Sequence, residues 1–168
     1  TIAQGFVLEN YPDSLFVALW NDTLDSWEYN ERYIFDYSAN KKIILEEKSE
    51  WTDYGWLLYD KKVYSYSNEK LSSITTSWWD LYYEEWINET LRHYKYDSIN
   101  RLQESKKMHW SESSLTWVND SLESYYYTAS GLLSSVYFDL WSLQFSTWEK
   151  NNMASYIYDN NANISEIA

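Results

Sequence analysis

The apolar and polar positions of this chain repeat with a period of about 31 residues. Residues 86–110 show the pattern most clearly. A Trp is followed eight residues later by the first Tyr of Tyr-x-Tyr-Asp, and then come a polar turn, a Leu, a polar run and a closing Trp. The first Trp of each copy is Trp27, Trp56, Trp86, Trp117 and Trp148, and the first Tyr column is Tyr33, Tyr64, Tyr94, Tyr125 and Tyr156. The aromatic two residues later is Phe35, Tyr66, Tyr96, Tyr127 and Tyr158, and the closing Trp is Trp20, Trp51, Trp79, Trp110 and Trp141. Four columns that share one period indicate a tandem repeat protein.

Alternation within each copy favours β-strands. In an extended chain, every second residue lies on one face, so the first Trp and both Tyr of a copy are predicted to share a face. A helix is the alternative near Trp79, Tyr82, Tyr83 and Trp86, whose spacing also fits a helical stripe. The scarcity of Ala, the abundance of Tyr, Trp and Thr, and the polar turn residues in the middle of every copy favour strands.

The predicted fold is all-β: tandem β-hairpin repeats that form an antiparallel meander of about ten strands. The sheet is extended or curled, with a closed barrel or a spiral as alternatives, since ten strands are many for an open twisted sheet. Residues 1–168 form one repeat array, with a half repeat at 1–20, full repeats at 21–51, 52–79, 80–110 and 111–141, and an incomplete repeat at 142–168. Polar turns are predicted at residues 38–42, 68–70, 98–100, 129–131 and 160–163. Within 1–20, the turn around Pro12 separates two apolar runs and predicts a hairpin.

The composition narrows the classes of function. The chain carries 26 acidic and 13 basic residues, a net charge of −13. This balance argues against nucleic acid and against anionic lipid as partners. No apolar run is long enough to span a bilayer, so membrane insertion is not predicted. There is no Cys, whereas aromatic residues make up 20% of the chain, which argues against disorder.

Candidate catalytic and metal-binding residues are few. His93 and His109 lie in one repeat on its two predicted strands, where a cross-strand surface pair is favoured over a metal pair. Asp36, Asp97 and Asp159 follow the two aromatics at a turn entrance, where Asp bends or caps the backbone. No phosphate-binding loop and no Ser or Cys nucleophile motif is present. We therefore predict no catalytic residues, no metal, no cofactor and no enzymatic activity.

The segment Tyr94-Lys95-Tyr96-Asp97-Ser98-Ile99-Asn100-Arg101-Leu102 resembles the tyrosine-aspartate (YD, RHS-like) repeats of secreted bacterial proteins, and residues 156–164 resemble them again. The longer unit with flanking Trp is similar to repeats in secreted and surface proteins of Bacteroidetes-type bacteria. The Asp of the motif is Ser67 in the second repeat and Thr128 in the fourth. The resemblance implies β-hairpin repeats that lie outside the cell or on its surface, and no particular activity.

Two functions are open. The aromatic columns fit ring ladders between strands, and they also fit a face that stacks on sugars. The two termini begin and stop inside a repeat and expose apolar residues, the possible assembly ends Ile2, Phe6, Val7, Ile164 and Ile167. The first prediction is therefore an extracellular structural protein that adds strands head to tail with copies of itself, as in a filament or surface assembly. The alternative is a carbohydrate-binding or adhesive module that uses exposed Trp and Tyr.

Overall fold

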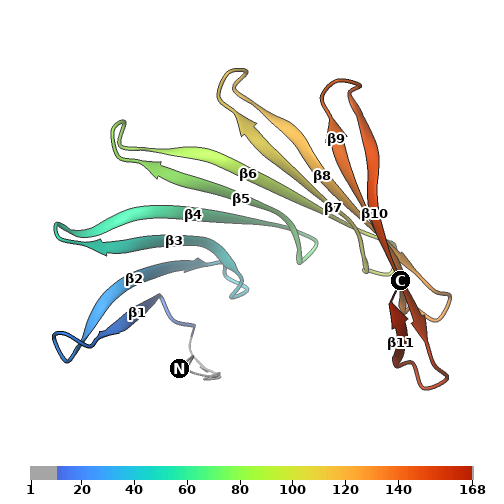
Figure 1. Cartoon of the computed structure of the whole chain (residues 1–168), viewed down its shortest axis with the longest axis horizontal. Helices are drawn as coiled ribbons and strands as arrows, with labels where there is room; N and C mark the ends of the chain where they lie inside the picture. The colour runs from blue at the N-terminus through green and yellow to red at the C-terminus, as the bar shows by residue number, and fades with distance from the viewer. Residues whose placement is uncertain (1–10, 168) are drawn as a thin grey trace. The chain divides into compact units, whose positions relative to one another are not determined.

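The structure, a computed structural model, describes residues 11–167, and this part of the chain is an all-β meander of eleven strands (Figure 1). The strands are β1 (Ser14–Asn21), β2 (Ser26–Tyr37), β3 (Ile43–Thr52), β4 (Gly55–Ser67), β5 (Lys70–Asp80), β6 (Glu85–Tyr96), β7 (Leu102–Ser111), β8 (Thr116–Tyr127), β9 (Leu133–Ser142), β10 (Thr147–Tyr158) and β11 (Ile164–Ile167). They follow one another in sequence order, with β1 and β11 at the two ends of the order rather than paired with each other. The all-β prediction is confirmed, and residues 79–86 form strands and a turn instead of a helix.

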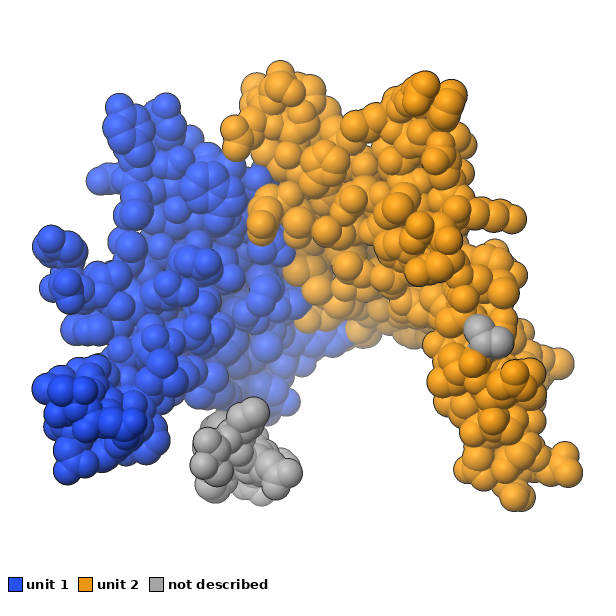
Figure 2. Space-filling model, viewed as in Figure 1, with its two compact units in different colours: residues 1–64, 76–88 blue, residues 65–75, 89–168 orange. Residues whose placement is uncertain are grey.

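The chain divides into two compact units, shown in different colours in Figure 2. Unit 1 comprises residues 1–64 and 76–88, and unit 2 comprises residues 65–75 and 89–168. The division passes through β4, β5 and β6. Unit 1 therefore holds β1, β2 and β3 whole, and unit 2 holds β7 to β11 whole.

One set of turns follows the tyrosine columns and repeats a single geometry. In the third repeat, the Asp97 amide donates to the Arg101 carbonyl, and the Asp97 carboxylate accepts from the Ile99 and Arg101 amides. Asp159 holds the last turn in the same way through the Asn161 and Asn163 amides. These hydrogen bonds lower the pKa of both Asp97 and Asp159, and the bond from the backbone amide at the end of the turn contributes most. The predicted turn role of Asp97 and Asp159 is confirmed.

The first repeat aligns differently from the prediction. The turn residue equivalent to Asp97 is Ser38, whose amide donates to the Lys42 carbonyl and whose hydroxyl accepts from the Lys42 amide. Asp36 lies inside β2 opposite Leu45, so its predicted place at the turn is wrong. Counting back from the turn, the equivalent of Tyr94 is Phe35 rather than Tyr33. The first member of the predicted Tyr column was thus displaced by two residues, because this repeat carries a third aromatic, Tyr37.

A one-residue bulge lies beside the paired Trp residues on four of the strands that carry the first Trp of a repeat, β2, β4, β8 and β10. On β8, Asp120 is skipped: Lys107 faces Ser121, whereas Met108 faces Asn119. Asn30, Tyr59 and Asn151 are skipped in the same way on β2, β4 and β10. An extra residue reverses the alternation of side chains along the rest of the strand. The prediction that the first Trp and both Tyr share a face is therefore wrong.

We call the side of each unit that carries the paired Trp residues the tryptophan face, and the other side the ion-pair face. In unit 2, the register from Trp117 through the bulge places Ser124 and Tyr126 on the tryptophan face and Glu123 and Tyr125 on the ion-pair face. The first Trp and the Tyr columns of this strand therefore lie on opposite faces, while residues such as Ser124 and Tyr126 share the face of the Trp.

Neither face is covered by a second layer of described residues. Met108, with 8% of its surface exposed, is the buried hydrophobic residue of the described part, and the other buried side chains there are Ser49, Ser77, Ser105 and Ser121. Stability must therefore come chiefly from the strand ladders and from cross-strand side-chain pairs. The described residues include no helix that is long and apolar enough to cross a membrane.

Candidate ligand-binding site

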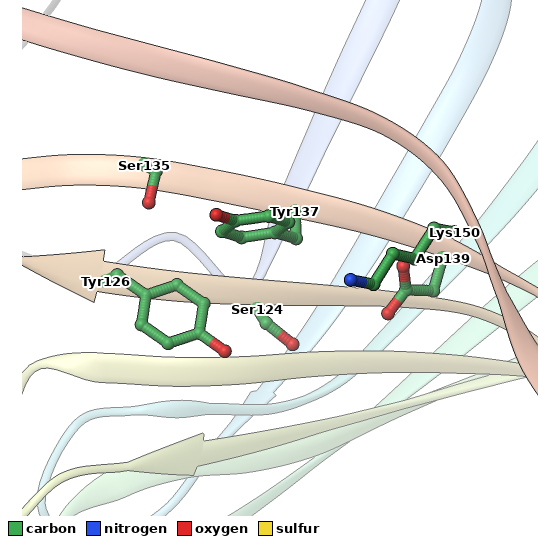
Figure 3. A pocket seen from close by; sticks show the side chains of 6 residues that line it. All are labelled: Ser124, Tyr126, Ser135, Tyr137, Asp139 and Lys150. Atoms are coloured by element: carbon green, nitrogen blue, oxygen red, sulfur yellow. The ribbon is translucent and has the colours of Figure 1, made fainter.

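A cavity of about 430 Å³ opens on the tryptophan face of unit 2, over β8, β9 and β10 (Figure 3). The side chains that line it are Ser124, Tyr126, Ser135, Tyr137, Asp139 and Lys150. The register explains why they meet: Ser124 faces Tyr137, Tyr126 faces Ser135, and Asp139 faces Lys150. The volume lies in the range that small-ligand sites occupy in proteins.

The cavity combines flat aromatic surface with polar groups. The rings of Tyr126 and Tyr137 meet edge to face, with centroids 5.3 Å apart and an angle of 79° between their planes. Tyr126 is 53% exposed, so much of its surface is open to a ligand. Figure 3 shows Asp139 and Lys150 side by side at one end of the cavity. Their carboxylate and ammonium, together with two serine and two tyrosine hydroxyls, can accept and donate hydrogen bonds.

An aromatic cluster occupies the equivalent position on the tryptophan face of unit 1. Phe16 corresponds to Tyr137 by its distance from the closing Trp, and Tyr29 corresponds to Lys150 by its distance from the first Trp. The cluster consists of Phe16, Tyr29, Trp51 and Trp56, whose neighbouring ring centroids lie 5.1 to 6.4 Å apart. Phe16 on β1 and Trp56 on β4 are three strands apart, about 14 Å at the usual strand spacing. Their ring centroids are only 5.9 Å apart, so the two side chains must lean toward each other across the strands that lie between them.

The ion-pair face of unit 1 is a network of charges. Lys48 Nζ lies 2.8 Å from Glu31 and 2.9 Å from Glu50, and Tyr33 donates to Glu31 at 2.8 Å. The bonds from Lys48 and then Tyr33 lower the pKa of Glu31. Burial alone would lower the pKa of Lys48, but its bonds to Glu31 and Glu50 outweigh this effect and raise the pKa. Burial raises the pKa of the neighbouring Asp60.

The ion-pair face of unit 2 is built in the same manner. Arg92 donates to Ser105 Oγ at 3.0 Å and lies 3.6 Å from Glu123, while Tyr125 donates to the same carboxylate. Burial and then the bond to Glu123 raise the pKa of Tyr125, and burial raises the pKa of Tyr94. Glu123 thus contacts Arg92 and accepts a hydrogen bond from Tyr125, as Glu31 contacts Lys48 and accepts one from Tyr33 in unit 1.

The predicted Trp columns come together as five cross-strand pairs beside the other set of turns. Ring centroids are 5.0 to 5.4 Å apart, with planes at 68° to 72°, in the pairs Trp20–Trp27, Trp51–Trp56, Trp79–Trp86, Trp110–Trp117 and Trp141–Trp148. The predicted ring pairing is thus present. The rings do not form a buried core, however, because Trp27 is 70% exposed and Trp51 is 49% exposed.

The second Tyr column has a recurring hydrogen bond. The hydroxyls of Tyr127 and Tyr158 donate to the Leu102 and Leu133 carbonyls at 2.7 and 2.8 Å, each on the preceding strand. Tyr37 makes the equivalent bond to the Pro12 carbonyl at 2.9 Å. These bonds tie neighbouring strands together and give the second column a structural role.

The structure does not bring the two histidines together. His93 lies opposite Lys106, whereas His109 lies opposite Thr90 and Val118. They point to different faces of the sheet, so the predicted cross-strand pair is wrong, and so is the metal pair it was weighed against. In residues 11–167, no group of three or more His, Asp or Glu side chains is arranged to hold a metal ion.

Of the possible assembly ends, Ile164 and Ile167 lie in β11 and are 54% and 63% exposed. Ile2, Phe6 and Val7 lie outside the described residues, as does the first strand of the hairpin predicted around Pro12. Whether these residues join an assembly stays a prediction.

Sequence reasoning missed the cavity because it followed the columns that recur. Tyr126 and Tyr137 are aromatics outside those columns: their equivalents in the third repeat are Lys95 and Lys106. Residues that depart from the repeat, rather than those that define it, were the available signal. The bulge also had to be known before Tyr126 could be placed on the same face as Tyr137.

Comparison with known proteins shows a shared fold. No family model matches the chain, and no curated protein matches it. A protein of unknown function from Bacteroides fragilis is similar in structure with a TM-score of 0.63 and 14% identity, over 74% of this chain and 91% of that one. DUF3836 family proteins from Bacteroides vulgatus and Parabacteroides distasonis give TM-scores of 0.47 and 0.43 at 18% and 19% identity, over 55% and 52% of this chain and 91% and 85% of theirs. This chain is thus an antiparallel β-hairpin repeat protein that shares its fold with the Bacteroides fragilis protein.

Proposed function

We propose that this chain is a binding module that holds a carbohydrate on its tryptophan face, with the cavity over β8, β9 and β10 as a sugar subsite. The observation that carries the proposal is the lining of that cavity: the Tyr126 and Tyr137 rings meet at 5.3 Å beside Asp139 and Lys150.

The chemistry suits a pyranose ring. One side of a pyranose carries mainly C–H groups, which pack against aromatic faces, and its rim carries hydroxyls. Tyr rings supply rigid apolar surface with a polar tip. The serine hydroxyls both donate and accept, the Asp139 carboxylate accepts, and the Lys150 ammonium donates. A ligand that needs both kinds of contact is therefore favoured over a purely apolar one.

The test is binding to a panel of immobilised glycans, followed by calorimetry with any glycan that binds. Tyr126→Ala and Tyr137→Ala should each weaken binding about tenfold or more, since stacking and hydrogen bonding are both lost. Tyr54→Ala is the matched control, because Tyr54 is a fully exposed turn tyrosine of unit 1 and should leave binding unchanged. A panel without any binding, or binding that both cavity variants retain, would refute the proposal.

Assembly by strand addition is a second candidate, favoured by the outer edge of β10. The strand β8 is paired by β7 over residues 116–124 and by β9 over residues 121–127. The equivalent outer residues of β10 are 152–158. Among the described residues, β11 pairs with β10 over residues 156–158. A strand edge with free backbone N–H and C=O groups can pair with a strand of another chain.

A strand from a second copy fits that edge, in keeping with the head-to-tail assembly expected from the sequence. Met153 is 49% exposed there, and Met153→Lys places a charge on the edge. If strand addition occurs, multi-angle light scattering and electron microscopy will show oligomers or filaments that this variant loses. A protein that stays monomeric at all concentrations would exclude the assembly.

Both candidates are roles outside the cell or at its surface, which is what the resemblance to tyrosine-aspartate repeats implies. Protease accessibility of the protein on intact cells would test this location. Loss of the protein only after cell lysis would contradict it.

A further inference from the structure

Arg32 lies within the aromatic cluster of unit 1. It faces Phe16 on β1 and Ser49 on β3. Its guanidinium carbon is 5.1 Å from the centroid of the Trp56 ring, and Nη2 donates to Ser49 Oγ at 3.4 Å. A guanidinium that lies against an aromatic face is held in place without losing its charge.

Arg32 has no acidic partner among the described residues, whereas six other bases do. Lys48, Lys62, Arg92, Lys95, Arg101 and Lys107 each lie 2.7 to 3.6 Å from a carboxylate. Among residues 11–167, no carboxylate lies within ion-pair distance of Arg32. On the same face, Glu47 lies diagonally to it by register and directly faces Lys61. Arg32 differs from the other bases that lack a printed ion pair in lying within the Phe16, Tyr29, Trp51 and Trp56 ring cluster, with its guanidinium against Trp56.

The rings around Arg32 are open to solvent. Phe16, Tyr29 and Trp51 are 51%, 58% and 49% exposed. The cluster therefore offers stacking surface around a positive charge, whereas the cavity of unit 2 offers hydroxyls and a carboxylate–ammonium pair. The two sites occupy equivalent positions of two repeats but differ in charge.

We infer that the aromatic cluster of unit 1 binds an acidic glycan, a pyranose that carries a carboxylate as in a hexuronic acid. The inference rests on the proposed glycan-binding function and names the ligand class at this second site. The sugar ring stacks on the exposed aromatic side chains. The carboxylate accepts hydrogen bonds from the Nη1 and Nη2 groups at the end of the Arg32 guanidinium, because Nε is buried.

The net charge of the chain is unfavourable for binding an acidic ligand. A net charge of −13 repels polyanions at long range, so general electrostatics oppose binding of an acidic glycan. A preference for an acid over its uncharged counterpart must then arise from a local cation. Arg32 is the cation that the cluster contains.

The test compares oligogalacturonate with its methyl ester, which keeps the sugar backbone and removes the charge. Binding is followed by calorimetry and by quenching of tryptophan fluorescence, since Trp51 and Trp56 lie in the cluster. The acid should bind about tenfold or more tightly than the ester, because a charge-assisted hydrogen bond is lost in the ester. Arg32→Gln should abolish the preference, and Arg32→Lys should retain part of it.

Lys106→Gln is the matched control, since Lys106 lies on the tryptophan face of unit 2 and should leave the preference unchanged. The urea midpoint of each variant shows whether it still folds. Equal binding of acid and ester, or a preference that survives in folded Arg32→Gln, would overturn the inference while leaving glycan binding intact. Failure of the acid, the ester and every neutral glycan on the panel would overturn the proposed function as well.

Discussion

Replacing Lys48 by Met tests whether the ion-pair face stabilises the sheet. Lys48 Nζ contacts Glu31 at 2.8 Å and Glu50 at 2.9 Å, and only 14% of its side chain is exposed. Glu31 and Glu50 face each other directly across β2 and β3. Without Lys48, two carboxylates stand opposite each other with the Asp60 carboxyl nearby, and like charges in such positions destabilise a sheet.

The magnitude follows from the burial of each partner. Hydrogen bonds to charged groups contribute about 1.5–3 kcal/mol each where solvent is excluded, and exposed ion pairs about 0.2–1 kcal/mol. Glu31 is 24% exposed, whereas Glu50 is 41% exposed, so its share must be discounted for solvent screening. The expected cost of Lys48→Met is therefore about 2 kcal/mol of unfolding free energy at pH 7.

The cost should depend on pH. Because the pKa of Glu31 is lowered in the folded protein, its contribution is present above the ordinary glutamate pKa and is lost as the pH falls through the lowered value. In the variant, protonation instead relieves the repulsion between Glu31 and Glu50. The difference between wild type and variant should thus be smaller at pH 4 than at pH 7.

Urea unfolding followed by tryptophan fluorescence measures both effects. Lys95→Met is the control, because its pair with Glu104 is equally short at 2.7 Å but the lysine side chain is 68% exposed. It should cost less than about 1 kcal/mol. A Lys48→Met cost no larger than that of the control, or a difference that grows on acidification, would refute the reasoning.

Three further predictions concern the repeat itself. A double-mutant cycle of Trp110→Ala and Trp117→Ala should give a coupling free energy of about 0.5–1.5 kcal/mol by urea unfolding, and a value near zero would mean that the edge-to-face contact adds nothing. Gly131 has φ +89°, and a Cβ there would meet only Arg101 Nη1 at 3.9 Å, an ordinary van der Waals contact, so Gly131→Ala should cost about 1–2 kcal/mol from backbone strain. Lys41→Gly at the equivalent position (φ 60°) should raise the thermal midpoint. Asp97→Ala removes the acceptor of two turn amides and should lower the urea midpoint. Asp36→Ala is the control, because Asp36 lies inside β2 and not at a turn.

The period of the sequence was sufficient to predict the strands, the turns and the meander. Turn residues and the alternation of apolar and polar residues are local signals, and they recur in every repeat. The face of each side chain was not predictable in this way, because a single skipped residue such as Asp120 reverses it without any change in composition. The pairing of His93 and His109 failed for a related reason, since register decides whether two residues on adjacent strands meet.

The cavity was harder to foresee than the fold. Ser124, Tyr137 and Lys150 come from three strands and are joined only by their register. Arg32 could be read as one more surface cation until its neighbours were known. Recurrence identifies what holds a repeat protein together, whereas ligand chemistry is carried by side chains that occur once.

The skipped residue in each strand has a consequence for how such a chain can evolve. It places the first Trp and the Tyr columns of a strand on opposite faces, so a substitution on one face leaves the contacts of the other face in place. Equivalent positions already hold Phe16 and Tyr29 in one hairpin and Tyr137 and Lys150 in another. Side chains on the tryptophan face can therefore change in one hairpin while the ion pairs and tyrosine hydrogen bonds of that hairpin are kept.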